Sequence, residues 1–162
     1  MEDNRILKLV YTFFLGLLLA IFIGVGINTF YAPPEPPKYP VELNTTYGKE
    51  MSEKQIAMEK DYGQKMETFD NTKMEPYNRN VSIMTLSAAV LLLAVSLMLE
   101  KKKVEVISDG VMLGGLFTLL YSLGRGFASQ DSKYSFISIT VGLMVVLYLG
   151  YHRFVKTKKP SK

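Results

Sequence analysis

The chain has 162 residues, of which 48% are hydrophobic, and its formal net charge is +4. It contains no cysteine, which excludes disulfides, thiolate nucleophiles, cysteine metal sites and a lipidated cysteine anchor. Its apolar residues are gathered into four blocks, whereas the core of a soluble domain draws on apolar positions scattered at helical or strand spacing. We therefore predict an all-α fold: a four-helix transmembrane bundle with an extracytoplasmic amphipathic helix between the first two spans.

The first apolar block is uncharged and follows Arg5 and Lys8. A bilayer core about 30 Å thick needs roughly 20 apolar helical residues. We predict a cytoplasmic N-terminus over 1–8 and a first span over 9–30. The run is longer than the apolar region of a signal peptide, so we expect the span to be retained.

A proline-rich segment follows, with five of the seven prolines between positions 33 and 40. Proline fixes φ and removes N–H donors, so 31–50 is predicted to be a stiff, extended extracytoplasmic spacer.

An amphipathic helix is predicted over 51–75, where Ser52 and Gln55 have the spacing of a capping box. We expect Pro76 to kink or end it before the next span. Its apolar side chains share one narrow arc and are predicted to contact a partner, the membrane surface or a second copy of the chain: Met51, Met58, Tyr62, Met66 and Phe69. Methionine sulfurs seven or eight residues apart are too distant to bind one copper ion, so no metal is expected.

Three further spans are predicted, over 77–99, 106–126 and 134–154. A basic cytoplasmic link covers 100–105, an extracytoplasmic link covers 127–133, and a basic cytoplasmic tail covers 155–162. The exact start of the third span stays open, because Asp109 lies close to it.

The basic residues predict the orientation. Ten of the nineteen Lys and Arg lie in the N-terminal segment, the 100–105 link and the C-terminal tail. Cytoplasmic loops carry an excess of such residues. We therefore expect both termini in the cytoplasm and residues 31–80 on the extracytoplasmic side, with the lipid bilayer, not nucleic acid, as the basic residues' partner.

Small residues recur at intervals of four inside the predicted spans. Such faces let helix backbones approach closely in lipid. They predict helix contacts, either within the bundle or between copies of the chain, at Gly16, Ala20, Gly24, Gly110, Gly114, Thr118, Ser122, Ser138 and Gly142.

Two charged residues fall within the third span. Asp109 has three interpretations: it or Ser108 caps the helix, it pairs with a nearby lysine, or it handles protons or ions. Arg125 is expected to reach the outer interface or to pair with Asp131.

Three runs carry a resemblance: 22–31 with the prolines that follow it, 77–83 and 108–115. They resemble small uncharacterised four-span membrane proteins of bacteria. The resemblance covers most of the chain, implies a bacterial inner (plasma) membrane and carries no activity.

No phosphate loop, nucleophile elbow, HExxH motif or carboxylate pair is present. We predict no catalytic residue, no cofactor and no enzyme. The leading hypothesis is a non-enzymatic membrane scaffold or accessory subunit that binds a protein partner or itself. The alternatives are a small ion or solute transporter or channel using Asp109, and a membrane sensor or anchor.

Overall fold

The computed structural model describes residues 3–46, 52–102 and 104–155. Within them every regular element is helical. The elements are α1 (Asp3–Phe30), the 3-10 helix η1 (Val41–Thr46), α2 (Glu53–Phe69), the π-helical η2 (Asp70–Met74), α3 (Glu75–Lys101), α4 (Glu105–Ala128), α5 (Ser132–Gly150) and the π-helical η3 (Tyr151–Val155).

Four helical segments are long and apolar enough to cross a membrane. They are Asn4–Phe30, Glu53–Lys101, Glu105–Ala128 and Ser132–Arg153. The prediction of an all-α chain with four such helices is confirmed. The third segment begins close to the predicted position 106, with Val104 as its N-cap residue.

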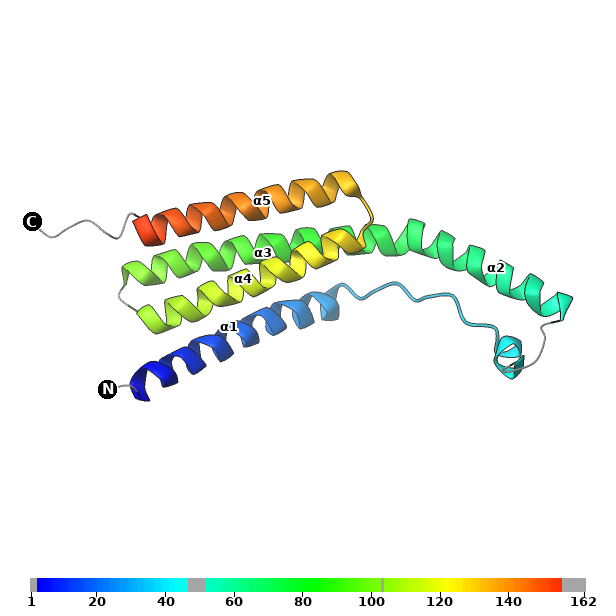
Figure 1. Ribbon diagram of the computed structural model, residues 1–162, viewed down its shortest axis with the longest axis horizontal. Helices are drawn as coiled ribbons and strands as arrows, with labels where there is room; N and C mark the ends of the chain where they lie inside the picture. The colour runs from blue at the N-terminus through cyan, green and yellow to red at the C-terminus, as the bar shows by residue number, and fades with distance from the viewer. Residues whose placement is uncertain (1–2, 47–51, 103, 156–162) are drawn as a thin grey trace, which may run out of the picture.

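The antiparallel pair α3 and α4 forms the centre of the bundle (Figure 1). α1 packs mainly on α4, and α5 packs more lightly on α4 and α3. Among the described elements α1 and α5 do not contact each other, so the four helices do not close into a ring. Most large apolar side chains of α1 and α5 are exposed on the outside of the bundle.

The contact between α3 and α4 combines small and hydroxyl side chains with Val81 and Leu93. Val81, Thr85, Ala89, Leu93 and Ser96 of α3 are each at most 2% exposed. They recur at intervals of three or four, which keeps them on one helix face. Small side chains on such a face let the two backbones approach closely.

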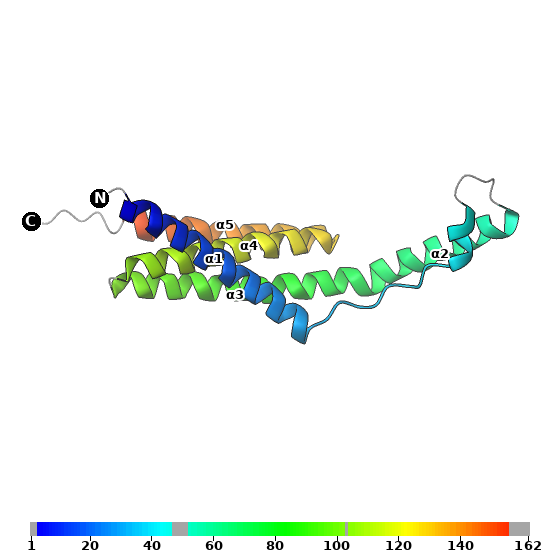
Figure 2. The same ribbon diagram turned by 90° about the horizontal axis from the view of Figure 1, so that it is seen from below.

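Residues 53–101 form one continuous helix of 49 residues, made of α2, η2 and α3. Of the two outcomes expected at Pro76, a kink or an end, the end is not found, because the helix continues through this residue. The Glu75 N–H bonds the carbonyl of Asp70, five residues back, in a widened π turn. This wider turn relieves the clash between a proline ring and the preceding carbonyls, so the helix bends there and continues (Figure 2).

The molecule has two distinct ends. α1 begins, α3 meets α4, and α5 ends at the same end (Figure 1), which we call the basic end because it carries Arg5, Lys8, Lys101, Lys102 and Arg153. From the opposite end, the arm end, α2 and η2 project beyond the bundle, with residues 32–46 running beside them. We call α2, η2 and residues 32–46 the arm.

Candidate functional site

The arm begins at a stable helix start. Ser52 and Gln55 form the predicted capping box: the Gln55 N–H bonds Ser52 Oγ at 3.4 Å, and the Ser52 N–H bonds Gln55 Oε1 at 3.0 Å. This arrangement satisfies two N–H groups that a helix start otherwise leaves without partners. Further along, Lys65 Nζ lies 2.6 Å from Asp61 Oδ2 on the exposed side of α2.

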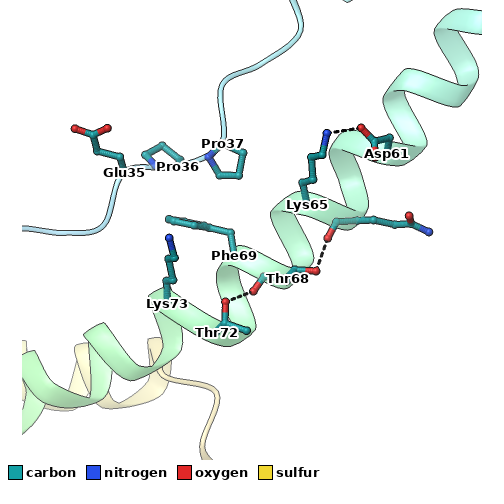
Figure 3. A pocket seen from close by; sticks show the side chains of 10 residues that line it. Glu35, Pro36, Pro37, Asp61, Lys65, Thr68, Phe69, Thr72 and Lys73 are labelled. Atoms are coloured by element: carbon teal, nitrogen blue, oxygen red, sulfur yellow. Dashed lines mark hydrogen bonds and ion pairs between the residues drawn. The ribbon is translucent and has the colours of Figure 1, made fainter.

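Part of the predicted partner-contact stripe is covered by the chain itself. The Tyr62 ring lies edge-on to Tyr39 of the proline-rich segment, with centroids 5.2 Å apart. Phe69 is 8% exposed and turns toward Pro36 and Pro37 (Figure 3). This cover was not predicted, because no motif in residues 31–50 indicates that the proline-rich segment folds back along the helix.

The rest of the stripe is less covered. Met58 and Met66 are half-buried. Met51 lies outside the described residues. The remaining open surface on this side of the arm is a groove of about 560 Å³, between the proline-rich segment and the helix (Figure 3). Its floor is Phe69 and its rim carries Lys65, Lys73 and Glu35.

A polar cluster joins three helices at the arm end of the bundle. Arg125 of α4 donates from Nη1 to Asn78 Oδ1 at 2.8 Å and from Nε to the Tyr121 hydroxyl at 3.0 Å. Asn78 of α3 donates in turn to the carbonyl of Ala128 at 3.0 Å. The guanidinium lies 5.7 Å from the ring centroid of Tyr77. These contacts connect α3 to α4 through a charge-assisted network.

The same cluster holds the end of α1. Tyr31 stacks on Tyr77 with centroids 5.3 Å apart, and the Tyr77 hydroxyl donates to the Tyr31 carbonyl at 3.3 Å. Asn80 donates to the Tyr31 hydroxyl at 3.0 Å. The network therefore fixes the point where the proline-rich segment leaves the bundle.

The expected pair of Arg125 with Asp131 is wrong. Asp131 instead caps α5, accepting hydrogen bonds from the N–H groups of Lys133 and Tyr134 at 3.1 and 3.0 Å. Its other oxygen lies 3.8 Å from Nη1 of Arg79. A carboxylate at a helix N-terminus satisfies orphan N–H groups, and this local role takes Asp131 away from Arg125.

Asp109 lies at the basic end and is ion-paired with Arg153 of η3, the helical turn that follows α5. The interpretation that Asp109 or Ser108 caps this helix is wrong, because α4 starts earlier, at Glu105. No lysine among the described residues pairs with Asp109: its partner there is Arg153, which also contacts Met112 Sδ at 2.7 Å. Ser108 is buried and donates to the Ser96 carbonyl of α3 at 2.8 Å.

Some of the predicted small residues do make tight contacts within the chain. A Cβ at Gly16 would lie 2.9 Å from Leu113 Cβ, and one at Gly114 would lie 3.2 Å from the Gly16 carbonyl oxygen. A Cβ on Gly110 would meet Leu15 Cδ2 at 2.6 Å. These positions hold α1 against α4.

The remaining predicted small residues of α4 and α5 contact other helices. Thr118 is buried and back-bonds to the Gly114 carbonyl at 2.8 Å, and Ser122 donates to the Ser82 carbonyl of α3 at 2.8 Å. Ser138 and Gly142 are buried where α5 meets α4. Residues four apart drift by about 40° per step around a helix, so one series turns from α1 at Gly110 to α3 at Ser122.

Gly24 does not make such a contact, and Ala20 is half-buried. A Cβ on Gly24 would meet nothing within 4 Å. Both residues border a shallow groove beside Tyr121. α1 crosses the bundle obliquely, so its last turns lie away from α4 (Figure 2).

The sequence analysis also missed the serines of α3. Ser82 Oγ donates to the Ser122 carbonyl at 2.7 Å, which reciprocates the bond from Ser122. Ser82, Thr85, Ala89 and Ser96 are spaced three, four and seven residues apart, which places them on one face of α3.

The folded chain is thus an all-α protein with four helices suited to crossing a membrane, joined by polar clusters at both ends. Among the residues that the structure describes, no group of three His, Asp or Glu is placed to hold a metal ion. No protein-family model, no curated protein and no solved structure matches the chain.

Proposed function

We propose that this chain is a multi-pass protein of the plasma (inner) membrane that acts as a non-enzymatic scaffold or accessory subunit. α1, α3, α4 and α5 cross the bilayer, and the arm projects on the extracytoplasmic side to bind a protein partner. The contact surface is the far part of the arm.

The distribution of charge supports this orientation. Arg5, Lys8, Lys101, Lys102 and Arg153 gather at the basic end. Lys and Arg next to spans are retained on the cytoplasmic side. The arm then leaves the membrane on the opposite side.

The continuous helix from Glu53 to Lys101 is the observation that carries the proposal. Its 49 residues extend about 74 Å, whereas the hydrocarbon core of a bilayer is about 30 Å thick. The part before Glu75 therefore stands about 33 Å along the helix axis beyond α3. Among the described elements α2 contacts only η1 and η2, so the bundle does not need this helix for its packing.

Apolar side chains are exposed toward the far end of the arm. Val41 is 73% exposed, Ile56 is 54% exposed and Tyr39 is 49% exposed. Gln55 Nε2 donates to the Glu42 carbonyl at 3.4 Å, which brings the neighbourhoods of Ile56 and Val41 together. We infer that these exposed apolar residues serve together as a protein contact. We call Tyr39, Val41 and Ile56 the tip patch.

Photo-crosslinking in native membranes tests the proposal. A photoreactive amino acid at Ile56 or Val41 is expected to give discrete protein adducts, and Ile56→Glu is expected to abolish the adduct formed from Val41. The matched control is Phe136, which is 72% exposed on α5 and is expected to react with lipid. Absence of protein adducts from both tip positions, with Phe136 still reacting, would refute a partner at this surface.

A sensor or anchor is the second candidate, favoured by the same helix. Because α2, η2 and α3 are continuous, a movement of the arm would be transmitted along α3 to Lys101. A sensor requires ligand binding at the arm to change the environment of Lys101, and a scaffold does not. A fluorophore attached at Lys102→Cys distinguishes the two when the partner is added.

The transporter alternative receives less support. Asp109 is paired with Arg153 at one end of the bundle, and the α3–α4 contact beyond it is filled by buried Thr85, Ala89 and Thr118. A carrier requires polar groups along a path, and these residues lie in close packing.

A further inference from the structure

An apolar groove of about 410 Å³ lies between α3 and α5. Its α3 wall includes Val90, Ala94 and Met98, and its α5 wall includes Met144 and Tyr148. On α3 it covers eight residue steps, or about 12 Å along the helix. One leaflet of a hydrocarbon core is about 15 Å thick, so the groove has the length of a single leaflet.

The groove lies in the half of the bundle next to the basic end. In the other half three helices meet around Gly126 of α4: a Cβ there would lie 3.2 Å from Ser82 Oγ, 3.6 Å from Tyr134 Cε1 and 4.0 Å from Ser138 Cβ. α5 is therefore held closely at the arm end.

Cationic side chains lie where the groove ends. Lys102 is four residues after Met98 and Lys101 is four after Leu97, so each continues a groove-lining face of α3. Both lysines are exposed. Among the described residues from 97 to 105, Lys101 and Lys102 are the exposed cations, whereas Glu100 keeps its Oε2 buried and Glu105 is exposed at the start of α4.

We propose that this groove binds one acyl chain of an anionic phospholipid from the cytoplasmic leaflet, with the headgroup on Lys101 and Lys102. The inference rests on the proposed placement in a bilayer. A second copy of the chain fits less well, because a spanning helix is about 10 Å wide and crosses both leaflets, whereas the groove occupies one. Clusters of basic residues beside helix grooves on the cytoplasmic side recognise anionic headgroups.

The absence of tryptophan allows a direct measurement, because an introduced residue is the only indole. Met98→Trp places it in the groove. Leu147→Trp places it on α5 outside the groove, within two turns of the same end and with similar original exposure. The full chain is placed in vesicles of zwitterionic phospholipid, with increasing fractions of brominated phosphatidylglycerol or brominated phosphatidylcholine as quencher.

Brominated phosphatidylglycerol is expected to quench Met98→Trp at a much lower mole fraction than brominated phosphatidylcholine does. Leu147→Trp is expected to respond equally to the two. In the Met98→Trp background, replacing Lys101 and Lys102 by Gln is expected to weaken the preference by about fivefold for each lysine. The control with Arg5→Gln and Lys8→Gln, which removes the same charge from α1, is expected to leave it intact.

Ala94→Phe, which fills the groove, is expected to remove the preference for brominated phosphatidylglycerol. Leu91→Phe, on the exposed face of α3, is expected to leave that preference unchanged. Equal quenching by both lipids at both positions would mean ordinary boundary lipid and overturn the proposal. Quenching that disappears as the chain self-associates would also overturn it, by assigning the groove to a second copy. If neither indole is quenched by any brominated lipid, the proposed membrane placement itself fails.

Discussion

At the scale of single residues, polar side chains connect the helices at both ends of the bundle. Asn78 uses its amide twice, donating to the Ala128 carbonyl and accepting from Arg125. Asp109 and Arg153 join α4 to η3, the turn that follows α5, at the basic end. A polar group withdrawn from water destabilises the fold when its partner is removed. Each of these few contacts is therefore expected to contribute noticeably to the free energy of unfolding.

Asn78→Ala is expected to lower the free energy of unfolding by about 2 kcal/mol, because it removes a hydrogen bond from Arg125 and the donor to the Ala128 carbonyl. Asn80→Ala is the matched control: its single bond to Tyr31 is exposed, so a much smaller loss is expected. Unfolding of both variants in mixed micelles, followed by circular dichroism, measures the difference. Equal losses would show that the buried network adds no stability.

A double-mutant cycle on Asp109 and Arg153 is expected to give a coupling energy of about 1 kcal/mol, since the pair is only partly exposed. The same cycle on Asp61 and Lys65, whose side chains are mostly exposed, is expected to give a value near zero. Both are measured by equilibrium unfolding. The transporter alternative predicts in addition that Asp109→Asn abolishes flux in liposomes, and a purely structural pair predicts no flux to lose.

At the scale of helices, packing depends on where small residues meet a neighbouring backbone. Gly16 and Gly114 let α1 approach α4, whereas Gly24, two turns further along α1, faces open space. Gly16 and Gly24 both belong to the series of small residues four apart on α1. Only their position relative to the crossing point of the helices separates them.

Gly16→Ala is expected to cost about 1–3 kcal/mol, because the new Cβ would meet Leu113 Cβ at 2.9 Å and the Gly114 nitrogen at 3.0 Å. Gly24→Ala is expected to be neutral or to stabilise by up to about 1 kcal/mol, since alanine is the better helix former. Thermal unfolding in detergent compares them. A destabilised Gly24→Ala variant would instead indicate that this face of α1 packs against another chain.

At the scale of the whole molecule, the chain is polarised between a basic end and an arm end. The continuous helix connects them and fixes the direction in which the arm projects. In the orientation that we propose, the arm would meet a partner outside the cell and the basic end would meet anionic lipid on the cytoplasmic side.

The lack of cysteine makes sidedness directly measurable, because single cysteines can be introduced without background. In intact cells a membrane-impermeant maleimide is expected to label Glu53→Cys on the arm. It is expected to label Asn4→Cys and Lys102→Cys only after permeabilisation. Labelling in the reverse pattern would leave the four spans in place and invert the proposed orientation.

The sequence by itself determined the helical class, the four apolar segments, and the capping box at Ser52. These are local properties: a long uncharged run and a hydroxyl three residues before a glutamine act within a turn or a span. The small residues that bring α1 and α4 together at Gly16, Gly110 and Gly114 were also visible in it.

Only the tertiary structure decided which groups became partners. It paired Asp109 with Arg153, 44 residues away, and Arg125 with Asn78, 47 residues away, while Asp131 stayed with its own helix. In the folded chain Pro36 and Pro37 also lie beside Phe69, and one helix continues through Pro76. Such pairings depend on helix crossing angles and rotations, which arise from contacts along whole faces and have no signature in any single segment.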